Sequence, residues 1–220
     1  AGSTNVAASG LRLWLKADEM VQSNGVALTR WPDRSGWGHD ATQAVNSLAP
    51  FYVEGALCGK PAVDFDGVND CLAGQIGSVS GAVSVIAVCR FDKLTQPSGD
   101  SDYVMRIGEN TALRHMSISR CATGYAADWD NAYYSWMGSC SYKGPVLDGQ
   151  RWMIVSAVHG ATGVSHAVWV NGQSEPAEAY TGTLQLSGAL ELGRYANGGT
   201  PNHKSWLQHI AQKNWGVTPC

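Results

Sequence analysis

The chain has 220 residues, of which 44% are hydrophobic and 15% are charged. This length and hydrophobic content suit one folded domain and exclude a disordered chain. Fifteen basic and eighteen acidic residues give a net charge of −3, which excludes a protein that tracks nucleic-acid phosphates with a basic stripe. No apolar run approaches the roughly 18 residues of a membrane-spanning helix. We expect residues 1–10 to be a lead-in segment and residues 11–220 to form one domain.

Strand-length runs separated by short turns fill most of the chain. Residues 11–16 alternate apolar and polar side chains, and residues 83–90 are almost wholly apolar and β-branched, as in the central strand of a sandwich. Further runs lie at 27–31, 61–65, 151–159, 165–170 and 190–193. This pattern predicts an all-β, two-sheet antiparallel sandwich.

Two local signals add detail to this fold. Asn171-Gly172 predicts a two-residue hairpin turn, because both residues tolerate a positive φ. Ser205 and Gln208 have the spacing of a capping box, and Gly216 is a natural stop. Because Trp206, Leu207 and Ile210 would share one helical face, we expect a short C-terminal helix there.

Six cysteines and the start at Ala1 favour a processed, secreted or cell-surface protein with disulfides. None of the cysteines forms a Cys-x-x-Cys pair, so a zinc site is not expected. Six cysteines can form three disulfides in 15 different ways, and the sequence alone does not fix which. Short separations in sequence and the apolar run around Cys89 favour three bonds: Cys58–Cys71, Cys121–Cys140 and Cys89–Cys220.

Four segments carry a family resemblance: GLRLWLKAD at 10–18, WPDRSG at 31–36, HDATQ at 39–43 and GKPAVDFDGVND at 59–70. They resemble the opening part of bacterial laminin-G-like modules, which belong to the concanavalin-A-like lectin/glucanase superfamily. The resemblance does not extend over residues 95–150. It implies a jelly roll of two curved antiparallel sheets and a secreted, usually non-catalytic module. Many such modules bind glycans or partner proteins, and some bind calcium at a loop rim.

The segment Asp66 to Asp70 has two interpretations. It is a tight corner in which acidic side chains cap the backbone, or it is a calcium site formed by Asp66, Asn69 and Asp70, because hard oxygen ligands are close together there. The spacing is not that of an EF-hand. Trp14 and Trp31 are expected to pack in the core or at its edge rather than bind a ligand.

Catalysis is not expected. The six glutamates lack the Glu-x-Asp-x-x-Glu spacing of laminarinase-type hydrolases, and Gln208-His209 does not match the Gln-x-His strand of jelly-roll lyases. The histidines at positions 115, 159, 166 and 209 are scattered and have no matched serine or cysteine nucleophile.

The region between Cys121 and Cys140 is rich in aromatic and short polar side chains. Aromatic rings stack on the apolar faces of sugars, while carboxylate and amide groups bond to hydroxyls. The candidate glycan-binding residues are Tyr125, Asp128, Trp129, Asp130, Asn131 and Tyr133. The alternative is a hairpin whose aromatic side chains fill the sandwich.

The leading hypothesis is a secreted, non-catalytic recognition module that binds a glycan or a cell-surface protein. The alternative is a structural subunit of an extracellular appendage such as a pilus, and a weaker one is a carbohydrate-active enzyme. Compared with the resembling modules, the chain lacks room for one strand before Ser205. Either Trp206 to Ala211 is that strand, or the gap invites self-assembly by strand addition from another chain.

Overall fold

The computed structural model describes residues 10–80, 82–90, 101–108, 115–122, 129–130, 132–135, 140–143, 152–159, 165–174, 178–179, 185–193 and 209–210. Within these residues the regular structure is mostly β-strand, and every strand pairing is antiparallel. The helical elements described are two short 3-10 turns, η1 (Ala17–Glu19) and η2 (Asn46–Leu48). The predicted all-β antiparallel class is confirmed.

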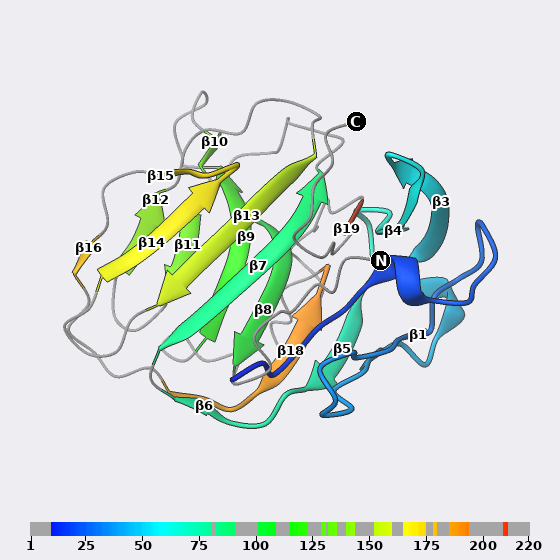
Figure 1. Ribbon diagram of the computed structural model, residues 1–220, viewed down its shortest axis with the longest axis horizontal. Helices are drawn as coiled ribbons and strands as arrows, with labels where there is room; N and C mark the ends of the chain where they lie inside the picture. Colours follow the sequence, from blue (N-terminus) through cyan, green and yellow to red (C-terminus); the bar gives the residue numbers. More distant parts are fainter. Residues whose placement is uncertain are drawn as a thin grey trace, which may run out of the picture.

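The described strands form two large sheets and one small one (Figure 1). The nine-stranded sheet has the order β1 (Arg30–Trp31), β2 (Ala41–Thr42), β5 (Leu72–Gln75), β18 (Ala189–Leu192), β8 (Ser101–Gly108), β9 (His115–Ala122), β11 (Ala132–Ser135) and β12 (Cys140–Lys143), with β10 (Trp129–Asp130) also on β9. The eight-stranded sheet has the order β15 (Gln173–Ser174), β14 (Ser165–Val170), β13 (Met153–His159), β7 (Val83–Arg90), β19 (His209–Ile210), β4 (Lys60–Asp64) and β3 (Phe51–Leu57), with β16 (Glu178–Ala179) on β14. The small sheet pairs β17 (Gln185–Leu186) with β6 (Val79–Ser80).

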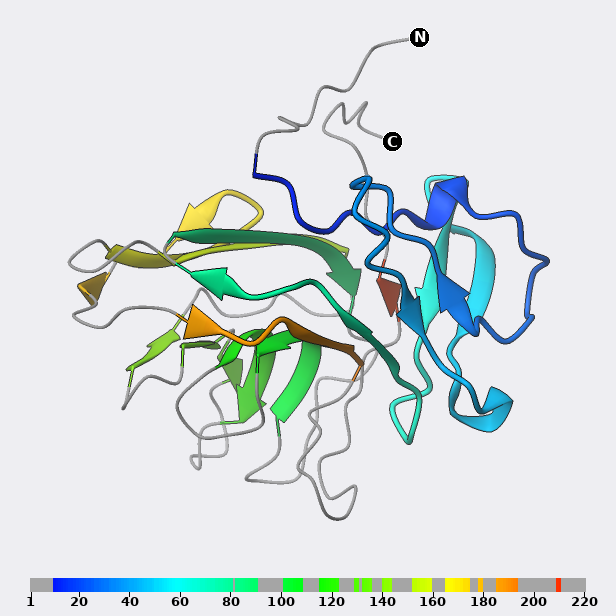
Figure 2. The same ribbon diagram turned by 90° about the horizontal axis from the view of Figure 1, so that it is seen from below.

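The two large sheets lie one above the other, with β7, β13 and β14 in one layer and β8, β9 and β18 in the other (Figure 2). Their facing side chains form the core, in which Trp31, Phe65 and Leu190 are among the largest fully buried side chains. Each apolar side chain removed from water in this way stabilises the fold by about 1.5–3 kcal/mol. The strand predicted at 83–90 is β7, whose Val85, Ala87 and Cys89 point into this core, as its buried position requires.

Two hairpins turn through residues with positive φ. Asn171 and Gly172 have φ of 51° and 81° between β14 and β15, so the predicted turn is confirmed. Cys58 and Gly59, with φ of 48° and 74°, connect β3 to β4 in the same manner. Positive φ at both central positions matches the twist of the flanking strands.

The predicted C-terminal helix is wrong at His209 and Ile210, which form strand β19 (Figure 1). Ile210 lies opposite Val63 of β4 and Cys89 of β7, both fully buried. A slot between two buried strands outweighs the local helical spacing, because the backbone of Ile210 pairs with both neighbouring strands there. The neighbouring residues 205–208 lie outside the described residues.

The position of β19 bears on the expected missing strand. It joins β7 to β4 within one chain, which agrees with the alternative in which the segment Trp206 to Ala211 supplies the strand. The empty strand position that suggested strand addition by another chain is therefore filled by His209 and Ile210 of the same chain.

The predicted disulfides of Cys71 and Cys89 are wrong. Cys89 is a buried free thiol, and burial raises its pKa to about 12. Cys71 is buried as a thiol whose sulfur accepts a hydrogen bond from Gln43 Nε2 at 3.0 Å. Cys58 is disulfide-bonded, and neither of these two residues is its partner.

The structure does not describe the side chains of the other three cysteines. The backbones of Cys121 and Cys140 lie in β9 and β12, and Cys220 is outside the described residues. The expected bond between Cys121 and Cys140 remains a prediction.

Candidate functional site

The predicted glycan-binding segment falls partly on strands of the nine-stranded sheet. Trp129 and Asp130 form β10, opposite Ala122 and Cys121 of β9. Tyr133 lies in β11, which pairs with β9 and β12. Tyr125, Asp128 and Asn131 are outside the described residues. The backbone thus places three of the six candidates at one end of a sheet, and the proposed role of their side chains stays a prediction.

The corner at Asp66 to Asp70 is closed by its own acidic side chains. Asp66 Oδ1 accepts hydrogen bonds from the backbone N–H groups of Val68, Asn69 and Asp70 at 2.8, 3.0 and 3.3 Å. Asp70 Oδ2 accepts one from the Asp66 N–H at 2.8 Å. This is the backbone-capping arrangement expected for a tight corner.

Asp70 is the buried member of this corner. Burial raises its pKa to about 6, helped by the charge of Asp66 and opposed by the hydrogen bond from the Asp66 N–H. Among the described residues no group of three or more His, Cys, Asp or Glu side chains is arranged to hold a metal ion. The calcium site at Asp66, Asn69 and Asp70 stays a prediction.

A second loop, residues 33–40, is fixed by one carboxylate. Asp33 Oδ1 accepts hydrogen bonds from the N–H groups of Trp14 and Ser35 at 2.9 and 2.8 Å. Its Oδ2 accepts from Ser35 Oγ at 2.6 Å and from the His39 N–H at 3.0 Å. Burial disfavours the charge of Asp33, but these four hydrogen bonds outweigh burial and hold its pKa below the ordinary value. Asp33 therefore joins both ends of the loop and the segment at Trp14 into one rigid unit.

Three further contacts anchor the same loop. The Asp33 N–H donates to Asp40 Oδ1 at 2.8 Å, and Asp40 Oδ2 accepts from Arg30 Nε at 2.6 Å. His39 Nδ1 lies 2.7 Å from the backbone carbonyl oxygen of Arg12. Since a carbonyl oxygen only accepts, Nδ1 carries the proton. The imidazole ring is thereby fixed against the chain at Arg12.

Trp37 stands out from this rigid loop. Its side chain is 59% exposed, whereas that of Trp31 is fully buried. The Arg12 guanidinium carbon lies 4.8 Å from the centre of the Trp37 ring, within the range of a cation–π contact. The His39 ring is tilted by only 8° from the Trp37 ring, with centres 6.1 Å apart. The two rings are therefore near-parallel neighbours. We refer to Arg12, Trp37 and His39 as the Trp37 platform.

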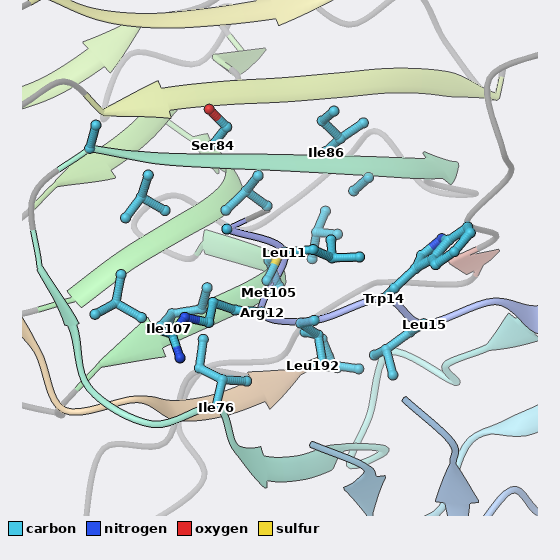
Figure 3. Close-up of a pocket in the computed structure, with 18 of the residues that line it drawn as sticks. Leu11, Arg12, Trp14, Leu15, Ile76, Ser84, Ile86, Met105, Ile107 and Leu192 are labelled. Atoms are coloured by element: carbon cyan, nitrogen blue, oxygen red, sulfur yellow. The ribbon is translucent and has the colours of Figure 1, made fainter. Parts of the chain in front are cut away.

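A cavity of about 390 Å³ lies beside this platform, between the two large sheets (Figure 3). Its walls include Leu11 and Arg12 of the N-terminal segment, Met105 and Ile107 of β8, and Leu192 of β18. Aliphatic side chains line much of it, and Arg12, Trp14, Ser78 and Ser84 add polar groups. The Trp37 platform shares Arg12 with this cavity and adds an exposed aromatic ring, which suits the apolar face of a sugar. The platform is therefore the candidate glycan site.

Sequence reasoning did not single out Trp37. The available signal was its position between Gly36 and Gly38, whose φ values are 92° and 73°. A tryptophan inside a glycine-rich turn cannot follow the alternation that carries side chains into a sheet core. An exposed aromatic side chain in such a turn is a candidate for binding.

No family model matches the sequence, and the search of curated proteins finds no significant match. Solved structures share the fold. A Trypanosoma rangeli sialidase in complex with 2,3-difluorosialic acid aligns with a TM-score of 0.55 and 14% identity, over 86% of this chain and 28% of the sialidase. Domain 4 of AbnA, an extracellular GH43 arabinanase from Geobacillus stearothermophilus in complex with arabinotriose, aligns with a TM-score of 0.53 and 13% identity, over 86% of this chain and 92% of that domain. At these identities the likeness shows the fold alone.

No helix in the described residues has the length and apolar character needed to span a membrane.

Proposed function

We propose that this chain is a non-catalytic carbohydrate-recognition domain and that the Trp37 platform contacts the sugar. One observation carries this proposal. Trp37 is exposed to solvent, whereas the loop around it is fixed by the four hydrogen bonds to Asp33. An exposed aromatic side chain on a loop held in place by hydrogen bonds presents its ring to a ligand, and covering the ring removes apolar surface from water.

The chemistry of the platform suits a sugar ring. The C–H face of a pyranose packs on a flat aromatic surface, and polar groups at its edge bond to hydroxyls. Trp37 and His39 supply the flat surface, and Arg12 supplies donors beside it. Because the loop is already ordered, binding needs little further loss of conformational entropy.

Both solved structures named above come from proteins that act on or bind carbohydrates, according to their descriptions. They support a carbohydrate-related function for this chain. With the resemblance of residues 10–43 and 59–70 to laminin-G-like modules, they also support assignment to a concanavalin-A-like jelly roll. We place the module outside the cell, in adhesion or glycan capture. The segment at Trp129 and Tyr133 is a second surface proposed for glycan contact.

Trp37→Ala tests the proposal directly. We expect the variant to lose retention on the glycans that the native chain binds on an array, while its thermal midpoint changes little, because the side chain is mostly exposed. Phe51→Ala is the matched control, since Phe51 is a 43% exposed aromatic residue on β3. Retained binding in Trp37→Ala, or equal loss in Phe51→Ala, contradicts the assignment of the platform.

Two other measurements distinguish the proposed function from its alternatives, an enzyme and a structural subunit. A carbohydrate-active enzyme would release new reducing ends from a bound glycan, and a recognition domain would leave the glycan intact. A structural subunit of an appendage would polymerise, which electron microscopy of the native material detects. Binding without cleavage and without polymer formation is the expected result.

A further inference from the structure

Arg12 differs from the other arginines around the Trp37 platform. Arg30 forms an ion pair with Asp40 at 2.6 Å, and Arg34 pairs with Glu19 at 3.5 Å. The guanidinium of Arg12 has no carboxylate partner and no hydrogen bond among the described residues; its contact is the face of Trp37. The platform therefore carries one positive charge that the described part of the chain does not neutralise.

The two carboxylates of the loop are engaged elsewhere. Asp33 accepts four hydrogen bonds, from Trp14, Ser35 and His39, which keep it ionised. Asp40 pairs with Arg30 and accepts the hydrogen bond of the Asp33 N–H.

The contact with Trp37 leaves the donors of Arg12 available. A guanidinium group has five N–H donors, and all of them lie in its own plane. The guanidinium carbon lies 4.8 Å from the centre of the Trp37 ring, and this cation–π contact uses the charge of the group. Because no N–H group of Arg12 has a hydrogen-bond acceptor among the described residues, its donors can bind a ligand.

We propose that the Trp37 platform selects carboxylated sugars, in which the sugar ring packs on Trp37 and the carboxylate accepts two hydrogen bonds from Arg12. This proposal rests on the proposed function of the same surface and adds the class of ligand. A planar carboxylate matches the arginine fork in a bidentate manner, whereas a neutral hydroxymethyl group at the same position accepts a weaker bond. Sugars of this class include uronic and nonulosonic acids.

The test compares acidic sugars with neutral partners of the same shape. The full chain is titrated with polygalacturonate and with its carboxyl-reduced polymer, and an array adds paired uronic, nonulosonic and sulfated glycans. We expect the native chain to bind carboxylated forms about 10–100-fold more tightly than the neutral forms, the range of one charge-assisted contact. Arg12→Ala should lower this ratio to about one, because it weakens binding of the carboxylated form more than binding of the neutral form. Arg12→Lys should give an intermediate ratio, because it keeps the charge and loses the fork.

Two controls separate selectivity from folding. Lys60→Ala removes one positive charge from β4, where Lys60 is exposed, and should leave the ratio unchanged. The bond from His39 Nδ1 goes to the backbone carbonyl of Arg12, so it persists in either Arg12 variant. An unchanged thermal midpoint and tryptophan emission then show that the platform is intact.

The outcomes distinguish this inference from the proposed function. If glycan binding depends on Trp37 but the native chain does not prefer acidic forms, or Arg12→Ala keeps the preference, the inference is overturned and the proposed function stands. A preference for sulfated over carboxylated sugars also overturns it. If no glycan on the array is bound, both are overturned.

Discussion

Trp14, Trp31 and Trp37 show how differently three similar residues are used. Trp31 is fully buried in β1, as its position in an alternating strand predicts. Trp14 is partly buried beside the cavity, with Lys16 Nζ 5.1 Å from its ring. Trp37 is exposed in a turn. The expected core packing is thus confirmed for Trp31. The candidate for ligand binding is Trp37, which belongs to no periodic pattern of apolar residues in the sequence.

Asp70 makes a prediction about pH. Its pKa of about 6 in the folded state exceeds that of an unfolded aspartate, about 3.9, so the folded state binds the proton more tightly. Its contribution to the free energy of unfolding is therefore present below about pH 4 and is lost as pH rises through about 6. We expect the loss to be on the order of 3 kcal/mol.

Asp70→Asn isolates this effect. The amide mimics the neutral carboxyl group and can still accept the hydrogen bond from the Asp66 N–H. Urea unfolding of both proteins at pH 4 and pH 7 should show the variant gaining stability relative to the native chain at the higher pH. A difference between the two proteins that does not change with pH would mean that Asp70 titrates normally.

At the scale of elements, strands β8 and β18 are joined by a buried ion pair. Arg106 lies opposite Glu191 in the register, and its Nη2 is 2.7 Å from Glu191 Oε2. The two side chains are 3% and 12% exposed. Removing one member of a buried pair leaves the charge of the other poorly compensated, which is strongly destabilising.

We expect Glu191→Ala to lower the free energy of unfolding by about 3 kcal/mol or more. Glu54→Ala, an exposed glutamate on β3, is the control and should change it by less than about 0.5 kcal/mol. Urea denaturation measures both. Equal, small effects would show that the β8–β18 pair is solvated.

Elements specified by local chemistry were predicted from sequence, and those decided by distant contacts were not. The strand at 83–90 and the turn at Asn171-Gly172 follow from apolar content and from backbone preference. Strand β19 does not, because Ser205 and Gln208 provide a helix-start signal, whereas Val63 and Cys89 determine the outcome from far away in the sequence. The same reason explains the wrong cysteine pairs: short separation in sequence does not measure distance across a sandwich.

At the scale of the whole molecule, Cys89 reports on global unfolding. Its thiol is fully buried in the core and its pKa is raised to about 12, so neither access nor the reactive thiolate is available in the folded state. We expect iodoacetamide to leave Cys89 unmodified in the native chain and to label it in denaturant, as peptide mapping by mass spectrometry will show. Labelling under native conditions, or recovery of Cys89 in a disulfide, would contradict the buried position of β7.

The place of β19 sets the order in which the protein can be completed during its synthesis. β7 and β4 are neighbours of β19 on either side, and both leave the ribosome long before Ile210 does. Until residue 210 is translated, the edges of these two strands face each other across an open seam that nothing local can close. Sheets closed by such distant pairings form slowly and expose apolar strand edges meanwhile. We therefore expect released chains that end before residue 209 to be retained by a holdase chaperone for longer than the full chain.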